Sequence, residues 1–429
     1  AQAWVRNHSD DFTVIASDTE SEPVADQETF TGLKPGYYLV YPEGGSTGTD
    51  SRGTDAMLVN VPRDNDAVLN IKSTFPTVDK KVDTNETVGD THDDATDNGS
   101  AQVGDTVTFT LKSKVPDMSD YTTFYFGFTD TLTRGLKIVD NAGKDVTDGD
   151  NLTINGLTVT IGGETVNGYT VSLHSNVLKV EFTNLKNVEQ ANQPEDIGKD
   201  IVVTYKAMIT EAAVVGTPAL NTVKVEYSND PTTGTKGEST PDESKVYTYD
   251  IDVNKWASDA GGKTGSLAGA KFVLSTSESL TNGESDASVI KLINTDSGTG
   301  NAYRVAKPGE ASAMTSFTTT DSGDIKISGL KAGTYYLHEI EAPDGYNKLK
   351  KPVKIEIVVA GEDYEHATIE VDDKAATGDD GNIIDVENKK GIELPETGSI
   401  GTIGLTALGV VVVVAGLFAF PRKKKTRQD

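Results

Sequence analysis

The chain has 429 residues, contains no cysteine and carries a formal net charge of −27. Its length allows about two to four domains, and no disulfide framework can hold them together. The acidic charge argues against nucleic-acid binding, because phosphate backbones would repel it. The sequence has no phosphate-binding glycine loop, no serine or cysteine nucleophile motif and no histidines at metal-ligand spacing, so we predict neither an enzyme nor a cofactor or metal site.

Nearly the whole sequence has the pattern of β-strands. Runs of Val, Ile, Thr, Tyr and Phe alternate with polar residues and are separated by clusters of Gly, Asn, Asp and Pro. This pattern predicts an all-β protein built of β-sandwiches, with one hairpin that turns at Gly162 and Gly163. Helical periodicity is scarce, and we expect at most a short helical excursion at residues 188–197.

Residues 1–73 form the first predicted unit, with its clearest strands at 36–40 and 57–61. No initiator Met or signal peptide is present, so we expect a processed or truncated start and an incomplete first unit. This unit holds two lysines and no set of polar groups on inward strand faces. We therefore predict no internal cross-link in it.

Residues 74–246 form the second predicted unit, and two of its strands place a polar group on an apolar face. In a strand, residues two apart share a face, so apolar alternation marks the side that packs into the core. This alternation selects Lys80, which lies between two valines, over its neighbour Lys81. It also places Asn221 on an inward face near the end of the unit.

Two carboxyl groups compete for a place beside Lys80 and Asn221. Asp130 follows three phenylalanines on its strand face, and such apolar surroundings raise the pKa of a carboxyl group. Asp105 also lies on an otherwise apolar face. Alternation alone therefore leaves both carboxyl groups open.

Residues 247–391 form the third predicted unit, in which Lys255, Glu339 and Asn388 each continue an inward apolar face. Burial pushes an amine toward its neutral form and a carboxyl group toward its protonated form. A neutral lysine is a nucleophile, and a protonated carboxyl group can polarise the asparagine amide and shuttle protons as ammonia leaves. The product would be an amide between the lysine and the asparagine. On alternation alone, an ordinary buried ion pair beside an amide is the simpler interpretation.

A longer motif in the third unit favours the covalent bond. The stretch Tyr335–Tyr346 reads YYLHEIEAPDGY and resembles the E-box of pilin and Cna B-type domains, YxLxExxAPxGY. The surroundings of Lys255 and Asn388 resemble the opening and closing strands of that immunoglobulin-like family. The resemblance implies a spontaneous intramolecular isopeptide bond, in which Lys255 is the nucleophile, Glu339 the acid and base, and Asn388 the electrophile.

The second unit resembles a related domain. Residues 128–136 are similar to the catalytic-aspartate region of the Cna A-type, or middle, domain of shaft pilins. This resemblance implies a second isopeptide bond between Lys80 and Asn221 with Asp130 as the acid and base. Asp105 remains the alternative for that role.

The last segment, residues 392–429, combines a short motif, an apolar run and a basic tail. Residues 399–420 contain no charge and are long enough for a membrane-spanning helix, with the basic tail on the cytoplasmic side. This order resembles the cell-wall sorting signal of Gram-positive surface proteins, in which a sortase attacks the bond after the motif's threonine and passes the threonine carbonyl to an amine. The membrane insertion would then be transient, whereas the alternative is a simple membrane anchor. The LPETG motif consists of Leu394, Pro395, Glu396, Thr397 and Gly398.

Together these resemblances imply a secreted, wall-anchored protein of a Gram-positive surface pilus. We predict its major structural subunit, in which Thr397 of one copy joins a lysine of the next. The expected partners are pilus-type and housekeeping sortases, neighbouring subunits and peptidoglycan, and a host matrix or mucus ligand is a further candidate. The alternative is a monomeric wall-anchored adhesin or minor pilin that binds a host matrix ligand.

The lysine that would accept Thr397 is not marked by a motif. Shaft pilins usually carry a Tyr-Pro-Lys type motif between the first and second domains, but residues 75–77 of this chain read Phe-Pro-Thr. Lys72 lies at this junction and is our choice for the acceptor. Lys81 is the alternative.

Overall fold

The computed structural model of the chain contains strands and short 3-10 helices in its described part. The prediction of an all-β protein is therefore confirmed. The described residues are 33–40, 57–63, 76–84, 95–119, 121–213, 217–229, 234–259, 261–296, 300–378 and 381–390.

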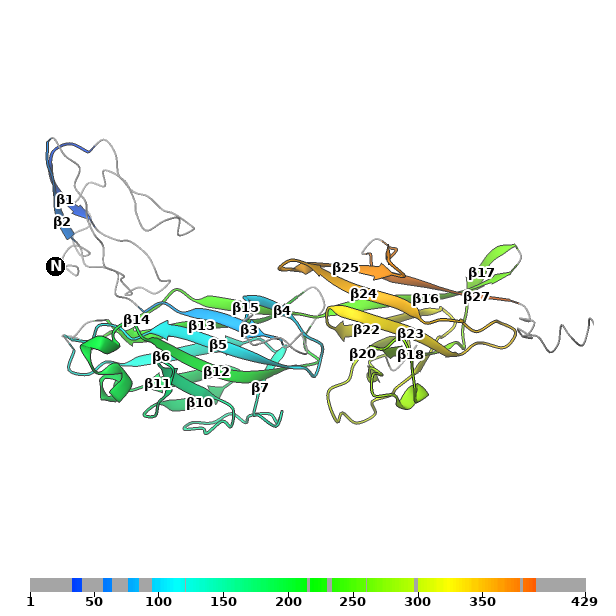
Figure 1. The fold of residues 1–429 in the computed structure, drawn as a ribbon, viewed down its shortest axis with the longest axis horizontal. Coiled ribbons are helices and arrows are strands. Elements are labelled where there is room, and N and C mark those ends of the chain that lie inside the picture. The colour runs from blue at the N-terminus through cyan, green and yellow to red at the C-terminus, as the bar shows by residue number, and fades with distance from the viewer. Residues whose placement is uncertain are drawn as a thin grey trace, which may run out of the picture.

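The first unit contributes a two-stranded antiparallel sheet. Its strands are β1 (Gly36–Val40) and β2 (Met57–Val61), as the sequence predicts. The hairpin stands apart from the larger sheets in Figure 1, where it is drawn in blue above one end of the molecule. The side chain of Tyr37 is exposed on it.

The second unit, called the middle domain below, is a sandwich of two mainly antiparallel sheets. Its long strands alternate strictly between buried and partly exposed residues, as a strand between a core and solvent should. One sheet consists of β3 (Asp79–Asp83), β5 (Thr106–Lys114), β12 (Asp200–Ile209), β8 (Thr158–Ile161) and β9 (Glu164–Thr165), with β7 (Leu136–Val139) also on β12. The other consists of β10 (Thr170–His174), β11 (Val177–Phe182), β6 (Phe126–Leu132), β13 (Ala219–Ser228), β15 (Asp242–Tyr247) and β4 (Asn98–Ser100), with β14 (Lys236–Glu238) also on β13.

Two local predictions in the middle domain hold. Strands β8 and β9 form the expected hairpin, and both turn glycines, Gly162 and Gly163, have positive φ angles of 60° and 86°. Such angles are needed at both centres of a tight hairpin turn and favour glycine. The helical excursion expected at residues 188–197 contains two short 3-10 turns, η3 (Glu189–Ala191) and η4 (Pro194–Asp196), and a third, η2 (Leu185–Asn187), comes just before it.

The third unit, called the third domain below, is a second sandwich. Its first strand and its last strand are parallel neighbours, so the two ends of the domain lie side by side. One sheet consists of β17 (Gly262–Ser266), β16 (Tyr249–Asp259), β22 (Asp324–Leu330), β20 (Ala302–Val305) and β19 (Leu292–Asn294), with β27 (Ile383–Lys389) also on β16. The other consists of β21 (Phe317–Thr318), β18 (Lys271–Ser275), β23 (Gly333–Glu341), β24 (Val353–Ala360), β25 (Asp363–Val371) and β26 (Lys374–Ala375), and η5 (Gly283–Ser285) follows β18.

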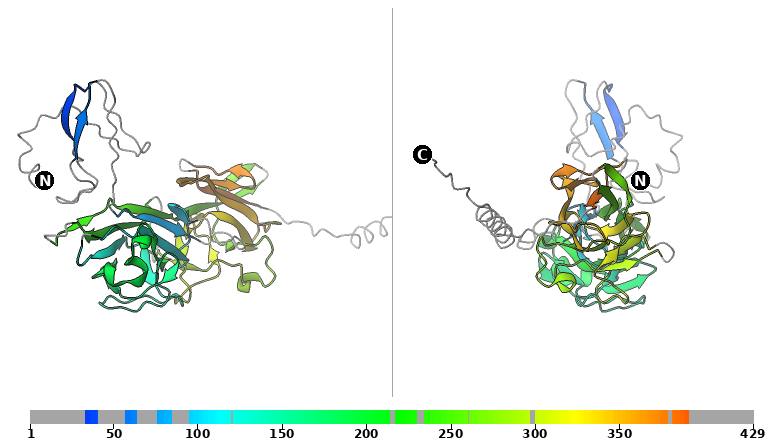
Figure 2. Two further views of the ribbon diagram at one scale, coloured as in Figure 1. Left: turned by 60° about the vertical axis from the view of Figure 1, so that its left-hand side comes forward. Right: turned by 90° about the vertical axis from the view of Figure 1, so that its right-hand side faces the viewer.

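The middle and third domains meet end to end (Figures 1 and 2). The backbone N–H of Val103 donates to the carbonyl oxygen of Gly329 at 3.0 Å. The backbone N–H of Ala332 donates to the hydroxyl of Ser100 at 2.7 Å. These bonds hold the main chain of one domain against the main chain and a buried side chain of the other, so the junction is a packed contact rather than a free linker.

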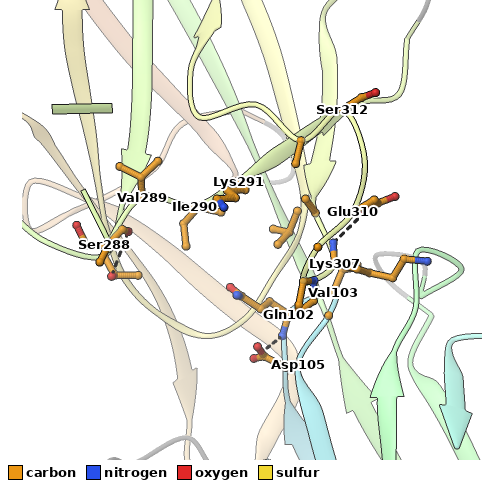
Figure 3. Close-up of a pocket in the computed structure, with 18 residues that line it drawn as sticks. Gln102, Val103, Asp105, Ser288, Val289, Ile290, Lys291, Lys307, Glu310 and Ser312 are labelled. Carbon is orange, nitrogen blue, oxygen red and sulfur yellow. Dashed lines mark hydrogen bonds between the residues drawn. The ribbon is translucent and has the colours of Figure 1, made fainter. Parts of the chain in front are cut away.

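Charged side chains and a groove complete this junction. Lys331 Nζ lies 3.2 Å from Asp105 Oδ2, and Lys307 Nζ lies 2.6 Å from Glu211 Oε2. Figure 3 shows the groove between the domains, with Gln102, Val103 and Asp105 on one side and residues 288–291, 307–310 and Ser312 on the other. Asp105 therefore belongs to the contact between the domains.

We predict that Gly104→Ala loosens this junction. Gly104 has a φ of +90°, and a Cβ there would lie 2.7 Å from Pro308 Cδ and 3.0 Å from Lys307 Cα of the third domain. Small-angle X-ray scattering should therefore show a broader distribution of interdomain distances for this variant.

The matched control is Gly143→Ala. Gly143 has a φ of +76° but nothing within 4 Å of an added Cβ, so it carries the conformational strain, about 1–2 kcal/mol, without the contact. Its scattering should equal that of the wild type. Equal scattering for both variants would contradict a junction that depends on close packing at Gly104.

Candidate functional site

The middle domain brings four polar side chains together in its core. Lys80 comes from β3, Asp130 from β6, Tyr205 from β12 and Asn221 from β13, and each is 0% exposed. The lysine and the tyrosine belong to one sheet, whereas the aspartate and the asparagine belong to the other. The cluster therefore bridges the two layers of the sandwich.

The four groups form one continuous hydrogen-bonded chain. Lys80 Nζ donates to both carboxylate oxygens of Asp130, at 2.7 and 2.9 Å. The Tyr205 hydroxyl donates to Asp130 Oδ2 at 2.5 Å, and Asn221 Nδ2 donates to the Tyr205 hydroxyl oxygen at 2.6 Å. The lysine and the asparagine are thus connected through the carboxylate and the phenol.

Burial controls the protonation of this cluster. Desolvation lowers the pKa of Lys80, and the attraction and hydrogen bonds of Asp130 oppose this shift. The Lys80 Nζ also lies 4.9 Å from the centre of the Phe109 ring. Desolvation, followed by the charge of Asp130, raises the pKa of Tyr205 well above its ordinary value, so its hydroxyl stays protonated.

The third domain contains a second cluster with a different pattern of contacts. Lys255 lies on β16, Glu339 on β23 and Asn388 on β27, and all three are buried. Asn388 Nδ2 donates to Glu339 Oε1 at 2.7 Å, so carboxylate and amide touch directly. The backbone N–H of Leu349 donates to the other oxygen, Glu339 Oε2, at 2.7 Å and holds the carboxylate in place.

The amine of Lys255 contacts backbone carbonyl groups instead of a carboxylate. Its Nζ donates to the carbonyl oxygen of Val386 at 3.1 Å. Desolvation lowers the pKa of Lys255 to about 8, while the more distant charges of Glu339 and Glu387 oppose the shift. A substantial fraction of this amine is therefore neutral and nucleophilic at mildly alkaline pH.

Strand register brings Lys255 and Asn388 together. Strands β16 and β27 run parallel, with Lys255 beside Val386 and Ala257 beside Asn388. Lys255 and Asn388 consequently project from the same face at diagonal positions, within reach of a long side chain.

Both asparagines share an unusual feature. The side-chain oxygens of Asn221 and Asn388 are buried and have no hydrogen-bond partner among the described residues. Leaving a buried acceptor unpaired costs about 1–3 kcal/mol, and few native groups are left so. Each asparagine amide is therefore held in its cluster through its nitrogen atom, by Tyr205 in one domain and by Glu339 in the other.

The structure separates the two carboxyl groups that the sequence left open. Asp130 contacts Lys80 directly, whereas Asp105 pairs with Lys331 of the third domain and accepts a hydrogen bond from the backbone of Gln102 at 3.3 Å. The geometry thus favours Asp130 as the partner of Lys80. Among the described residues, no group of three or more His, Asp or Glu side chains is arranged to hold a metal ion.

Of the two predicted acceptor lysines, the structure describes Lys81. Lys81 lies on the outer side of β3, where its Nζ is 2.5 Å from Asp97 and 3.5 Å from Asp79. The hydrogen bond to Asp97 is the main cause of its raised pKa. Lys72 and residues 394–398 lie outside the described residues, as does the predicted span at 399–420. Within the described part of the chain, no helix is long and apolar enough to cross a bilayer.

Tyr205 is the member of the site that sequence reasoning missed. In the alternation of β12 it occupies an inward position and counts as one more apolar residue. A signal was available, since a tyrosine hydroxyl facing a core must find a polar partner there.

Two family models match parts of the chain. Residues 250–375 match the SpaA family, described as a prealbumin-like fold domain, and this range includes Lys255 and Glu339. Residues 386–426 match the LPXTG cell wall anchor motif. The predicted sorting signal is thereby confirmed, and the chain has the C-terminal signal of a cell-wall-anchored surface protein. A comparison with curated protein sequences found no match.

Several solved structures resemble this one. The major pilin subunit BcpA of Bacillus cereus is 20% identical, with a TM-score of 0.44 over 74% of this chain and 71% of that one. A 35 kDa C-terminal fragment of the major pilin GBS80 of Streptococcus agalactiae is 21% identical, with a TM-score of 0.48 over 73% and 99%. The major pilin SpaA of Corynebacterium diphtheriae is 18% identical, with a TM-score of 0.45 over 84% and 82%. These are likenesses of fold.

The unreacted third domain should become more stable as the pH rises above 8. We consider Asn388→Ala, which cannot form the bond. The pKa of Lys255 is about 8 in the folded domain and about 10.4 in an unfolded chain, so between these values the unfolded chain binds more protons. Its unfolding free energy should therefore rise by up to about 1.4 kcal/mol per pH unit in this window.

The matched control is the double variant Lys255→Met/Asn388→Ala, which lacks the titrating amine. Urea unfolding of both chains, followed in the third domain by the fluorescence of Trp256, gives the difference between them at each pH. A difference that stays constant from pH 8 to pH 10 would contradict a desolvated Lys255.

Proposed function

We propose that this protein is the major structural subunit of a sortase-polymerised surface pilus, stabilised by one internal isopeptide bond in each large domain. The observation that carries the proposal is the repeated burial of a lysine, a carboxyl group and an asparagine in two successive sandwiches. The cell wall anchor motif that follows these domains supports a role outside the cell.

In the third domain, the reaction joins Lys255 to Asn388. The neutral amine attacks Cγ of the asparagine, the Nζ–Cγ bond forms, and the electron pair of the carbonyl group moves to Oδ1. Glu339 carries a proton from Nζ to Nδ2, the electron pair on Oδ1 reforms the carbonyl group as the Cγ–Nδ2 bond breaks, and ammonia leaves. The 2.7 Å contact between Glu339 and Nδ2 of Asn388 lies on this proton path.

In the middle domain, the corresponding bond joins Lys80 to Asn221, with Asp130 as the acid and base. The contacts of Asp130 with the lysine support this choice over Asp105, which lies at the domain junction. Each bond forms once, inside the folded domain, so the chain is a structural protein and not an enzyme that turns over a substrate.

The bonds would give the protein the stability that disulfides give other exported proteins. A covalent tie that closes a loop of over a hundred residues is worth about 5 kcal/mol in the chain-entropy model. In the third domain the tie would join the first strand to the last, β16 to β27. Tension applied at the two ends of this domain would then pass through the covalent bond and bypass the sheet.

The intermolecular joint would use the sorting signal. Sortase would cleave between Thr397 and Gly398 and transfer the threonine carbonyl to a lysine of the next subunit, with Lys72 as the proposed acceptor. A housekeeping sortase would attach the last subunit to peptidoglycan. The carboxyl end of the third-domain bond, Asn388, lies six residues before Leu394, so little chain would separate the two covalent links.

The internal bonds predict a specific mass. The folded chain should be lighter than its sequence by two molecules of ammonia, because each bond releases one. Glu339→Gln and Asp130→Asn should each prevent one bond, so the mass of each variant should be lower by only one ammonia. Peptide mapping should locate the remaining cross-link. Mass spectrometry of the intact chain and of its proteolytic fragments makes both measurements.

Asp105→Asn is the matched control for this experiment, because it changes the rival carboxyl group. It should retain both bonds. A mass equal to that of the unmodified sequence would refute the internal bonds, and loss of the middle-domain bond in the Asp105 variant alone would move the catalytic role to Asp105.

Polymerisation predicts a ladder of covalent multimers. Expression with a pilus-type sortase in a Gram-positive host should give bands of increasing mass that survive boiling in detergent. Thr397→Ala should abolish them, because the acyl donor is lost. Lys72→Arg should abolish them as well, whereas Lys81→Arg should not.

Immunoblots of wall extracts distinguish the outcomes. Loss of the ladder in the Lys81 variant alone would make Lys81 the acceptor. A single wall-linked band from the wild type would contradict the shaft subunit and favour a monomeric adhesin or minor pilin.

A further inference from the structure

The two clusters differ in what stands between the carboxyl group and the asparagine. In the third domain, Glu339 touches Nδ2 of Asn388 directly. In the middle domain, the Tyr205 hydroxyl occupies that place, 2.5 Å from Asp130 and 2.6 Å from Nδ2 of Asn221. The nitrogen that must leave as ammonia therefore contacts a phenol, and the carboxyl group lies behind it.

Side-chain length explains the difference. An aspartate is one methylene shorter than a glutamate, and both oxygens of Asp130 already contact Lys80 Nζ. The hydroxyl of Tyr205 spans the remaining distance to the amide. Its ring is held in place on β12, fully buried and stacked on Phe109 with ring centres 5.6 Å apart.

We propose that Tyr205 is a catalytic residue of the Lys80–Asn221 bond, which relays the proton from Asp130 to the leaving nitrogen. This inference rests on the isopeptide bond proposed above for the middle domain. In the middle domain Asp130 and Tyr205 together transfer the proton to the leaving nitrogen, whereas in the third domain Glu339 alone would do so.

Asp130 and Tyr205 together move the protons that the reaction transfers. Asp130 takes a proton from the Lys80 ammonium, and the freed electron pair of Nζ attacks Cγ of Asn221 while the carbonyl pair moves to Oδ1. Asp130 then gives its proton to the Tyr205 oxygen as Tyr205 gives its own to Nδ2. The Cγ–Nδ2 bond breaks and ammonia leaves, the carbonyl group reforms, and Asp130 accepts the second proton of Nζ and ends neutral.

In the resting cluster, Asn221 Nδ2 donates to Tyr205 and Tyr205 donates to Asp130, which is opposite to the direction in which the proton must move. The reaction itself reverses these two hydrogen bonds. An amide nitrogen only donates, because its electron pair is delocalised into the carbonyl group. Once Cγ becomes tetrahedral, Nδ2 is an amine that can accept a proton from Tyr205. Burial and the charge of Asp130 raise the pKa of Tyr205, so a concerted exchange of protons is favoured over a free phenolate.

The test compares the two bonds within one chain. The full chain is made by a short pulse of cell-free synthesis and quenched at intervals, and mass spectrometry of its peptides follows each cross-link. Tyr205→Phe keeps the ring that stacks on Phe109 but removes the hydroxyl. It should slow the Lys80–Asn221 bond by about 10²-fold or more, the usual contribution of a general acid, and leave the Lys255–Asn388 bond unchanged.

A second variant separates proton transfer from a merely structural role. Tyr205→3-fluorotyrosine, introduced in the same system, keeps the shape and the hydrogen bonds but makes the hydroxyl more acidic. A relay predicts a changed rate for the middle-domain bond alone. An unchanged rate for both variants would overturn the relay, whereas a wild type without the middle-domain bond would refute the proposed function itself.

Discussion

The structure depends on keeping two lysine amines out of water. Lys80 and Lys255 are both 0% exposed, and an isolated buried ammonium costs several kcal/mol. In the middle domain the Lys80 amine donates a hydrogen bond to the carboxylate of Asp130, and in the third domain the Lys255 amine donates one to the carbonyl oxygen of Val386. An amide bond would remove the charge permanently, which gives a physical reason for a chain without cysteine to retain such unfavourable groups in its cores.

Strand alternation was sufficient to find most of the candidate sites. Because the side-chain period of a strand is two, a polar residue at an inward position stands out, and this located Lys80, Asn221, Lys255, Glu339 and Asn388. The structure places the first two in one cluster and the last three in another. Alternation predicts their inward position because one face of each strand packs in the core, where all five side chains are buried.

The same reasoning could not choose between Asp105 and Asp130. Alternation shows which face of the strand a residue lies on, but not whether the residue lies in the centre of the sandwich or at its end. Asp105 lies at the end of the domain, because it precedes the first residue of β5. Its partner, Lys331, belongs to another domain and is 226 residues away in sequence. Tyr205 was missed for a different reason, since a tyrosine fits an apolar pattern while its hydroxyl takes part in polar chemistry.

The two isopeptide bonds would leave unequal lengths of chain between the bonded asparagine and the end of its domain. In the third domain Asn388 lies in the last strand, but in the middle domain Asn221 lies in β13, and residues 222–247 follow before the third domain begins. Tension that crosses a Lys80–Asn221 bond must still pass through the hairpin of β13 and β15. Strand β15 is held by its pairing with β13 and β4, and the carboxylate of Asp242 accepts the backbone N–H of Lys80 at 2.7 Å. These hydrogen bonds, rather than the covalent one, would set the force at which the middle domain first extends.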